Sequence, residues 1–202
     1  MQPVTSITST ICPIDANDVD TDQIMPKQFL KRVERTGFGP FAFFEWRYLD
    51  DGTTPNPGFA MNKPEHAGAE ILLAGRNFGS GSSREHAPWG LEDAGFRAII
   101  AESFADIFAN NCANIGLVCV ELPEATIRNL FEAVAAHPGA RFTVDLESMT
   151  VMGAGIQAGF TLDEHTRHRL RHGLDPIGIS LQHEADITAF EVTRESWRPR
   201  VA

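Results

Sequence analysis

The sequence predicts an α/β fold built around a sheet of short, buried, parallel strands. Three apolar runs, at residues 71–74, 97–101 and 117–120, have the length and composition of strands that are covered on both faces. Segments of helical character separate them, and this alternation of strand and helix is typical of parallel pairs. The 202 residues are 43% apolar, enough for a core that needs no disulfide or metal.

The chain before the first apolar run is predicted to hold one strand and two loops. Residues 4–12 alternate closely enough for a strand, which leads into the polar loop 15–22. Residues 50–66 contain several glycine and proline turn pairs, so we expect them to form an exposed excursion.

Two helices are predicted between and after the buried strands. Ser103, with Asp106 three residues later, resembles a capping box and predicts a helix that starts there and runs to about Asn111. The other helix closes at Pro138-Gly139. Its apolar face consists of Ile127, Leu130, Phe131 and Val134.

The C-terminal third is predicted to add short strands and then helices. Glycine-bearing turns join three strand-like stretches, at 142–146, 150–152 and 156–162. A helix is expected from Asp163 to His172, and Asp175-Pro176 has the signature of a last helix. We therefore expect a single domain over residues 1–202 with a helical tail from about residue 163.

Charge and cysteine content exclude several classes of protein. The formal net charge of −10 argues against nucleic acid as a partner. No stretch is long and apolar enough for a bilayer and the N-terminus lacks a secretion signal, so we expect no membrane association and a cytoplasmic location. Cys12, Cys112 and Cys119 are spread too widely for a disulfide framework, a zinc site or an iron–sulfur site. If the chemistry needs a metal, another chain must supply it.

One histidine cluster could suggest a metal site. His165, His168 and His172 share a helical face, but arginines 167, 169 and 171 alternate with them and would weaken a bound dication. We expect a solvated basic face and assign no metal.

Residues 75–86 form the segment with the strongest chemical signal. They follow the strand at 71–74 and precede a predicted helix, and their glycines allow backbone N–H groups to turn toward an anion at the helix N-terminus. The segment lacks the Gly-Lys-Ser/Thr of a P-loop, and Arg84 stands where a dinucleotide fingerprint needs glycine. A structural alternative is that Ser82 or Ser83 merely caps the helix, but this would not explain three glycines and two arginines in one turn.

The run Gly-Ser-Gly-Ser-Ser-Arg-Glu-His-Ala at 79–87 resembles the signature of aconitase-like hydro-lyases, and residues 20–24 with 26–30 resemble an upstream motif of the same domain. Further stretches are similar to the small subunits of 3-isopropylmalate dehydratases, namely 35–39, 46–49, 103–108 and 110–112. The likeness covers most of residues 1–190. It implies a swivelling β/β/α three-layer domain of the aconitase C-terminal type, with a helical C-terminal extension.

The resemblance also implies an activity. Such a subunit would interconvert 2-isopropylmalate and 3-isopropylmalate by dehydration and rehydration in leucine biosynthesis, together with a large subunit that holds a [4Fe–4S] cluster. The substrate would be a small hydroxy-dicarboxylate. A related hydro-lyase of the methylmalate/citraconate or homoaconitate type is an alternative, and so is a non-catalytic module that senses a dicarboxylate.

The resemblance assigns roles to seven residues. Ser82 would be the catalytic base, acting as an alkoxide that converging backbone N–H groups and Arg84 stabilise. Arg84 would bind a substrate carboxylate. The other expected substrate-site residues are Ser83, Thr21, Asp22, Lys27 and Leu30. For Thr21 and Asp22 an Asx-type turn is an alternative, Lys27 could be a solvated lysine, and Leu30 could hold the loop down instead of lining an isopropyl pocket. The role of His86 stays open.

Overall fold

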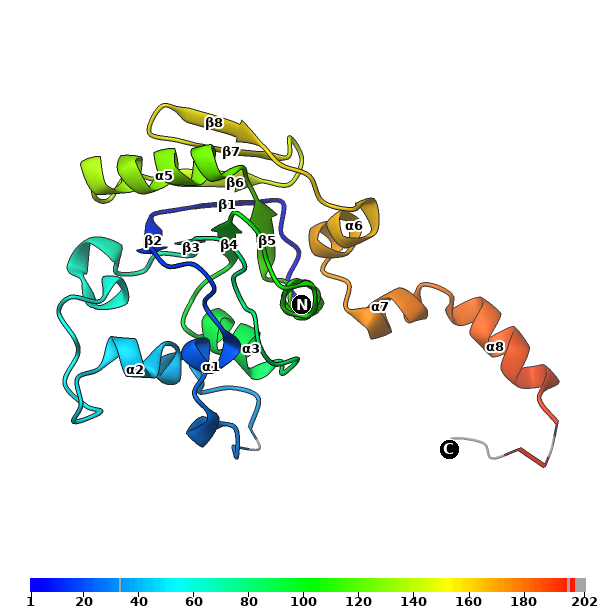
Figure 1. Cartoon of the computed structure of the whole chain (residues 1–202). Helices are drawn as coiled ribbons and strands as arrows, with labels where there is room; N and C mark the ends of the chain where they lie inside the picture. The colour runs from blue at the N-terminus through cyan, green and yellow to red at the C-terminus, as the bar shows by residue number, and fades with distance from the viewer. Residues whose placement is uncertain (33, 196, 199–202) are drawn as a thin grey trace.

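Two four-stranded sheets form the centre of the computed structural model, which describes residues 1–32, 34–195 and 197–198 (Figure 1). The parallel sheet has the order β2-β3-β4-β5, with strands Ile11–Ile14, Ile71–Ala74, Ala98–Ala101 and Val118–Glu121. The antiparallel sheet has the order β1-β6-β7-β8, with strands Ser6–Ser9, Phe142–Asp145, Thr150–Gly153 and Ile156–Gly159. The predicted parallel sheet is confirmed, with β2 as one strand more than the three expected.

The prediction of one strand at 4–12 is wrong. This stretch holds β1 and the start of β2, which belong to different sheets. β1 pairs with β6 and β2 pairs with β3, so the chain crosses between the sheets at Thr10. Ile7 and Ile11 both lie in the core between the sheets. Pro13, which has no N–H to donate, is tolerated in β2 because β2 is an edge strand.

The parallel sheet is buried on both faces, which explains its continuous apolar runs. Along β3, Ile71 and Leu73 belong to the core that faces the antiparallel sheet, whereas Leu72 and Ala74 belong to the core under the helices. The helix layer contains α1 (Thr21–Ile24), α2 (Phe44–Arg47), α3 (His86–Asp93) and α4 (Asp106–Ile115). Helix α5 (Glu124–Ala136) packs against β2, β3 and β8 with the apolar face that the sequence predicts. The expected β/β/α layering is confirmed.

Two local expectations are corrected. Helix α4 begins at Asp106 with Ala105 as N-cap, because the Ser103 hydroxyl is used elsewhere and accepts a hydrogen bond from the Asn77 N–H at 2.9 Å. The excursion at 50–66 is only partly exposed, since Phe59, Ala60 and Met61 pack against the core. Its short 3-10 helices are η3 (Ala60–Asn62) and η4 (Pro64–His66), and two more, η1 (Lys27–Phe29) and η2 (Gly39–Phe41), lie earlier in the chain.

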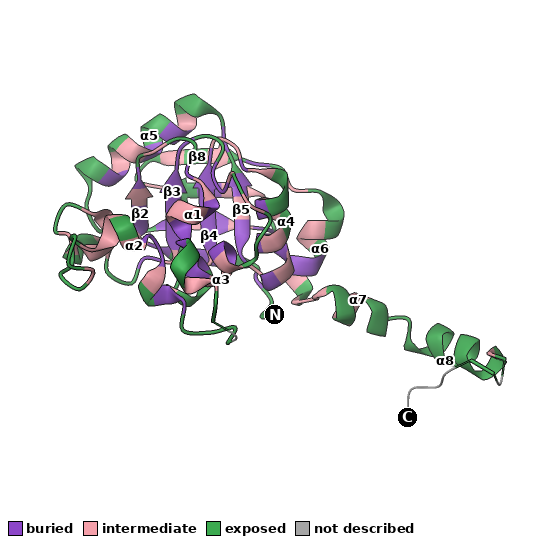
Figure 2. Cartoon of the chain, turned by 60° about the horizontal axis from the view of Figure 1, so that its bottom comes forward, coloured by how far each residue is buried: buried purple, intermediate pink, exposed green. Residues whose placement is uncertain are grey.

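The last three helices differ in how they relate to the sheets. Helix α6 (Glu164–His172) is anchored by Leu170, and its buried Arg169 donates to Asn114 Oδ1 at 2.8 Å. The expected solvated basic face is therefore wrong at Arg169. Helices α7 (Pro176–Leu181) and α8 (Glu184–Thr193) project away from the sheets (Figures 1 and 2). Within the described residues, no helix is long and apolar enough to span a bilayer.

Candidate active site

The two sequence motifs meet because they follow neighbouring parallel strands. β2 leads into α1 and β3 leads into the loop before α3, so both loops leave the same edge of the sheet. Asp20 and Ser80 form a parallel bridge between these loops. The Thr21 N–H donates to the Ser80 carbonyl at 2.7 Å and the Gly79 N–H donates to the Val19 carbonyl at 2.8 Å. This edge is where open α/β sheets bind their ligands.

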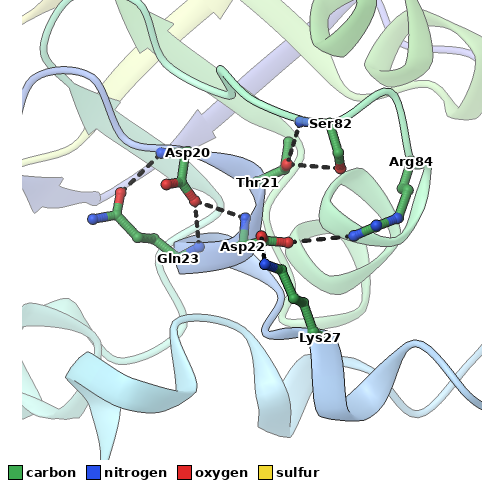
Figure 3. Close-up of polar contacts among 7 residues, drawn as sticks. All are labelled: Asp20, Thr21, Asp22, Gln23, Lys27, Ser82 and Arg84. Carbon is green, nitrogen blue, oxygen red and sulfur yellow. Dashed lines mark hydrogen bonds and ion pairs between the residues drawn. The ribbon is translucent and has the colours of Figure 1, made fainter.

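A capping box fixes the one-turn helix α1. The Asp20 carboxylate accepts the N–H groups of Asp22 and Gln23, each at 2.8 Å, and the Gln23 side chain accepts the Asp20 N–H at 2.8 Å (Figure 3). The pattern Asp-x-x-Gln is a capping signal from which this turn could have been predicted. It explains how four residues hold a helical turn that carries Thr21.

Ser82 and Thr21 form a hydroxyl pair at the centre of the site. The two oxygens lie 2.9 Å apart, and the Ser82 N–H also donates to Thr21 Oγ1 at 2.9 Å. Either hydroxyl can donate in this pair, but a deprotonated Ser82 Oγ could only accept, so Thr21 would then be the donor. Thr21 is buried and Ser82 is half-buried, so the pair is partly shielded from solvent.

Three charged side chains border this pair. The Asp22 carboxylate lies between Lys27 Nζ at 3.1 Å and Arg84 Nη1 at 3.3 Å (Figure 3). Lys27 and Arg84 are 73% and 47% exposed, and exposed pairs of this kind hold together by only about 0–1 kcal/mol. An incoming carboxylate can therefore compete with Asp22 for both cations.

Glycine is required at the start of the turn. Gly79 has φ +78°, and a Cβ there would lie 2.1 Å from the Phe108 ring. Gly81 has φ +100°, with Thr21 Oγ1 at 3.3 Å from the position of a Cβ. These two residues let the turn pass between α4 and α1.

The expected cradle of backbone N–H groups is wrong in part. The N–H groups of Gly79 and Ser82 bind the neighbouring loop, and helix α3 begins only at His86 with Glu85 as its N-cap. Positive charge for an anion therefore comes from side chains and not from these two amides. The alternative in which Ser82 or Ser83 caps the helix is also wrong, because no side-chain cap is present at α3.

The remaining residues singled out by the sequence, Ser83, Leu30 and His86, lie around the Thr21–Ser82 pair and differ in their exposure and contacts. Ser83 is exposed, and its carbonyl accepts a hydrogen bond from Asn111 Nδ2 at 3.1 Å; the family-like stretch 110–112 contains Asn111, but no role in the site was expected for it. Leu30 lines a narrow crevice. The crevice is also lined by Thr21, Asp22, Met25, Ser82, Arg84, His86 and Ala87. His86 keeps a buried Nδ1 without a hydrogen-bond partner, and its ring packs on Phe38 and Trp89.

The cysteines and histidines do not assemble into a metal site within the described residues, where no group of three or more His, Cys, Asp and Glu could hold an ion. Cys12 is buried in the core, and this burial raises the pKa of its thiol to about 12. The ring centroids of His168 and His172 lie 4.1 Å apart with the rings tilted by 32°, and His172 Nδ1 lies 2.8 Å from the His168 carbonyl oxygen.

Family models match nearly the whole chain. Residues 1–125 match the aconitase C-terminal domain, and residues 128–164 match a model described as LeuD_N. Residues 177–202 match the C-terminal domain of the 3-isopropylmalate dehydratase small subunit.

Relatives that match over their full length are named 3-isopropylmalate dehydratase small subunits. The chain is 53% identical over 201 residues to the 3-isopropylmalate dehydratase small subunit of Rubrobacter xylanophilus, with 100% of both chains covered. It is 54% identical over 200 residues to the small subunit of Shewanella baltica, which covers 98% of this chain and all of the relative. A solved structure of 3-isopropylmalate dehydratase from Methanocaldococcus jannaschii superposes with a TM-score of 0.66 at 22% identity. It covers 92% of this chain and 99% of that one. At this identity the superposition speaks for the fold alone.

Proposed function

Because this chain belongs to the family of 3-isopropylmalate dehydratase small subunits, an aconitase-type hydro-lyase family of leucine biosynthesis, we propose that the Thr21–Ser82–Arg84 cluster is its share of the active site. The observation that carries the proposal is the 2.9 Å hydroxyl pair of Thr21 and Ser82 beside the cations of Lys27 and Arg84. A dicarboxylate substrate needs both a proton acceptor and cations, and this loop pair offers them together.

Ser82 is the proposed base. In the dehydration it takes the proton from one carbon of the hydroxy acid, while the hydroxyl leaves from the neighbouring carbon and a double bond forms between the two. Returning that proton to the carbon that lost the hydroxyl, and adding hydroxide at the other carbon, restores the elements of water in the opposite sense and gives the isomer. A serine can act this way only if its alkoxide is stabilised, and the Thr21 hydroxyl, 2.9 Å away, would donate one hydrogen bond to Ser82 Oγ once that oxygen is ionised.

Arg84 and Lys27 are the proposed carboxylate ligands. Asp22 holds both cations in place without substrate, and a substrate carboxylate would take over one or both of these contacts. The cations also favour the alkoxide of Ser82, because positive charge nearby lowers the cost of ionising the hydroxyl. Leu30, which lines the crevice, would contact the alkyl group of the substrate.

A large subunit is the proposed partner and the holder of the [4Fe–4S] cluster. The crevice beside Ser82 is too narrow for a dicarboxylate, so the substrate would bind over it, against another chain. When bound to the large subunit, the cluster would serve as the Lewis acid for the leaving hydroxyl. The unpaired thiols of Cys12, Cys112 and Cys119 suit a reducing compartment, and we place the complex in the cytoplasm.

The experiment mixes this chain with its large subunit, reconstituted with the cluster, and follows the absorbance of the alkene formed from 3-isopropylmalate. We expect turnover from the mixture and none from either chain alone. Citraconate and homoaconitate, tested in parallel, report on the related hydro-lyases. Turnover by the large subunit alone, together with dicarboxylate binding by this chain alone, would support a sensing module and contradict the proposal.

A further inference from the structure

We infer that the C-terminal arm, defined here as α7 and α8 (residues 176–193), is the clamp by which this chain holds the large subunit. Neither helix contains a buried residue. Figure 2 shows the arm as an almost entirely exposed extension beside the compact body, from which it projects. This inference rests on the proposed function only in that it takes the large subunit as the partner.

The arm carries most of the large apolar side chains that the described residues leave exposed. On α7, Ile177 and Leu181 are 68% and 58% exposed and lie one turn apart on one face. On α8, Phe190 and Val192 are 64% and 78% exposed. Ile187 lies three residues before Phe190 and Val192 lies away from that pair, so α8 is apolar on more than one face. Apolar side chains gathered and exposed in this way mark an interaction surface.

The helices are also too short to be stable alone. α7 has 6 residues and α8 has 10, whereas isolated helices below about 12–15 residues are marginal in water. Asp175 caps α7 by accepting the Gly178 N–H at 2.6 Å, but His183, the N-cap of α8, makes no side-chain capping bond. Burial of the apolar faces in a groove would supply the missing stability, as in other helix-in-groove complexes.

Charge argues against a second copy of this chain as the occupant. Helix α8 carries Glu184, Asp186 and Glu191 and no Lys or Arg, and the whole chain has a net charge of −10. Two arms packed against each other would set like charges side by side. The chemistry that fits is an apolar groove with a basic rim on a different protein.

The family matches point to the same partner. Residues 1–125 match a domain that, by its name, forms the C-terminal end of a longer aconitase chain, where a covalent link joins it to the rest. The arm lies instead in the region that matches a model specific to the small subunit. A small subunit is a separate chain, so it must hold its large subunit non-covalently, and the arm offers exposed apolar surface for that contact.

The test measures binding of the cluster-reconstituted large subunit to the full chain by sedimentation, independently of turnover. Leu181→Glu and Phe190→Glu place a charge on each apolar face without removing core volume. Met152→Glu is the matched control, because it adds the same charge at another exposed apolar side chain, 37% exposed, in β7 of the antiparallel sheet. Circular dichroism checks that all three variants fold.

We expect Kd to rise by about tenfold or more in both arm variants and to stay unchanged in the control. At saturating large subunit, kcat of the arm variants should equal that of the wild type, since the arm holds no residue of the proposed site. Unchanged Kd in both arm variants would overturn the inference, and so would a dimer of this chain alone that Phe190→Glu dissociates. Wild-type binding without turnover would instead refute the proposed function and leave the arm's role standing.

Discussion

The Thr21 hydroxyl lies 2.9 Å from Ser82 Oγ, and an ionised Ser82 could only accept a hydrogen bond from it. Thr21→Val keeps the volume and shape of the side chain but removes that donor. We expect kcat of the assembled enzyme to fall by about 10²-fold with little change in KM, because the hydrogen bond matters only when Ser82 is ionised. The rise of the rate with pH should also move to higher pH, since the alkoxide is less stabilised.

Thr21→Ser is the control for this effect, because it restores the hydroxyl at the same place. It should recover most of kcat and return the pH profile toward that of the wild type. A Thr21→Val enzyme with an unchanged pH profile would mean that Thr21 only packs beneath the loop.

Gly79 is constrained both by its positive φ and by the nearby Phe108 ring, and a matched pair of substitutions can separate the two effects. Gly68 has φ +72° with nothing within 4 Å of a Cβ, whereas Gly79 has φ +78° and would place its Cβ against the Phe108 ring. Gly68→Ala should lower the free energy of unfolding by about 1 kcal/mol from backbone strain alone. Gly79→Ala should cost about 1–3 kcal/mol more, from overpacking. Equal losses in urea denaturation would show that the loop moves away from Phe108 at no cost.

Single residues of the site were predictable where a motif carried them. Ser82 and Arg84 stand in the glycine-rich run, and Thr21 and Asp22 stand in the upstream motif. The bridge that Asp22 makes between Lys27 and Arg84 was not predictable, because it depends on how two loops 62 residues apart in sequence approach each other. Asn111 was missed for the same reason.

The helix α1 acts as the support of Thr21, and its cap is open to test. Asp20→Ala removes the carboxylate that accepts two N–H groups, and Asp163→Ala removes the equivalent cap of α6, which accepts the Thr166 N–H at 2.9 Å. Each should lower the free energy of unfolding by about 1 kcal/mol. Only Asp20→Ala should also lower kcat, because only α1 carries a residue of the proposed site. An equal effect of both variants on kcat would contradict a positioning role for α1.

The secondary structure was predictable to the extent that local chemistry determined it. The buried strands β3, β4 and β5 and the helices α5 and α6 lie close to their predicted positions, because their apolar runs and caps are unambiguous. The division of residues 4–12 into β1 and β2 depends on two sheets that form from distant segments, which no local pattern reveals. Ser103 failed as a helix start because Asn77, 26 residues away, takes its hydroxyl.

The whole molecule is acidic, with a formal net charge of −10, yet two of its cations meet at one edge of the parallel sheet. Lys27 and Arg84 both contact the Asp22 carboxylate there, near the loop that carries Ser82 (Figure 3). Roomier cavities lie elsewhere, such as a groove of about 310 Å³ that Phe104, Cys119 and Asp163 help to line. The crevice beside Ser82 is narrower than this groove, so the residues that line it identify the proposed site and its size does not. A narrow crevice is expected if another chain forms the opposite wall of the active site.

The most direct test of Ser82 as the base is turnover by the complex assembled with Ser82→Ala. The change removes one half-buried hydroxyl and no core volume, so the variant should fold and bind the large subunit as the wild type does. Ser83→Ala is the comparison, because Ser83 is an expected substrate-site residue whose hydroxyl lies outside the Thr21–Ser82 pair, so its loss should weaken turnover without abolishing it. We predict that Ser82→Ala abolishes formation of the alkene from 3-isopropylmalate while Ser83→Ala retains part of it. A near-normal rate in the Ser82→Ala complex would contradict the assignment of Ser82 as the base.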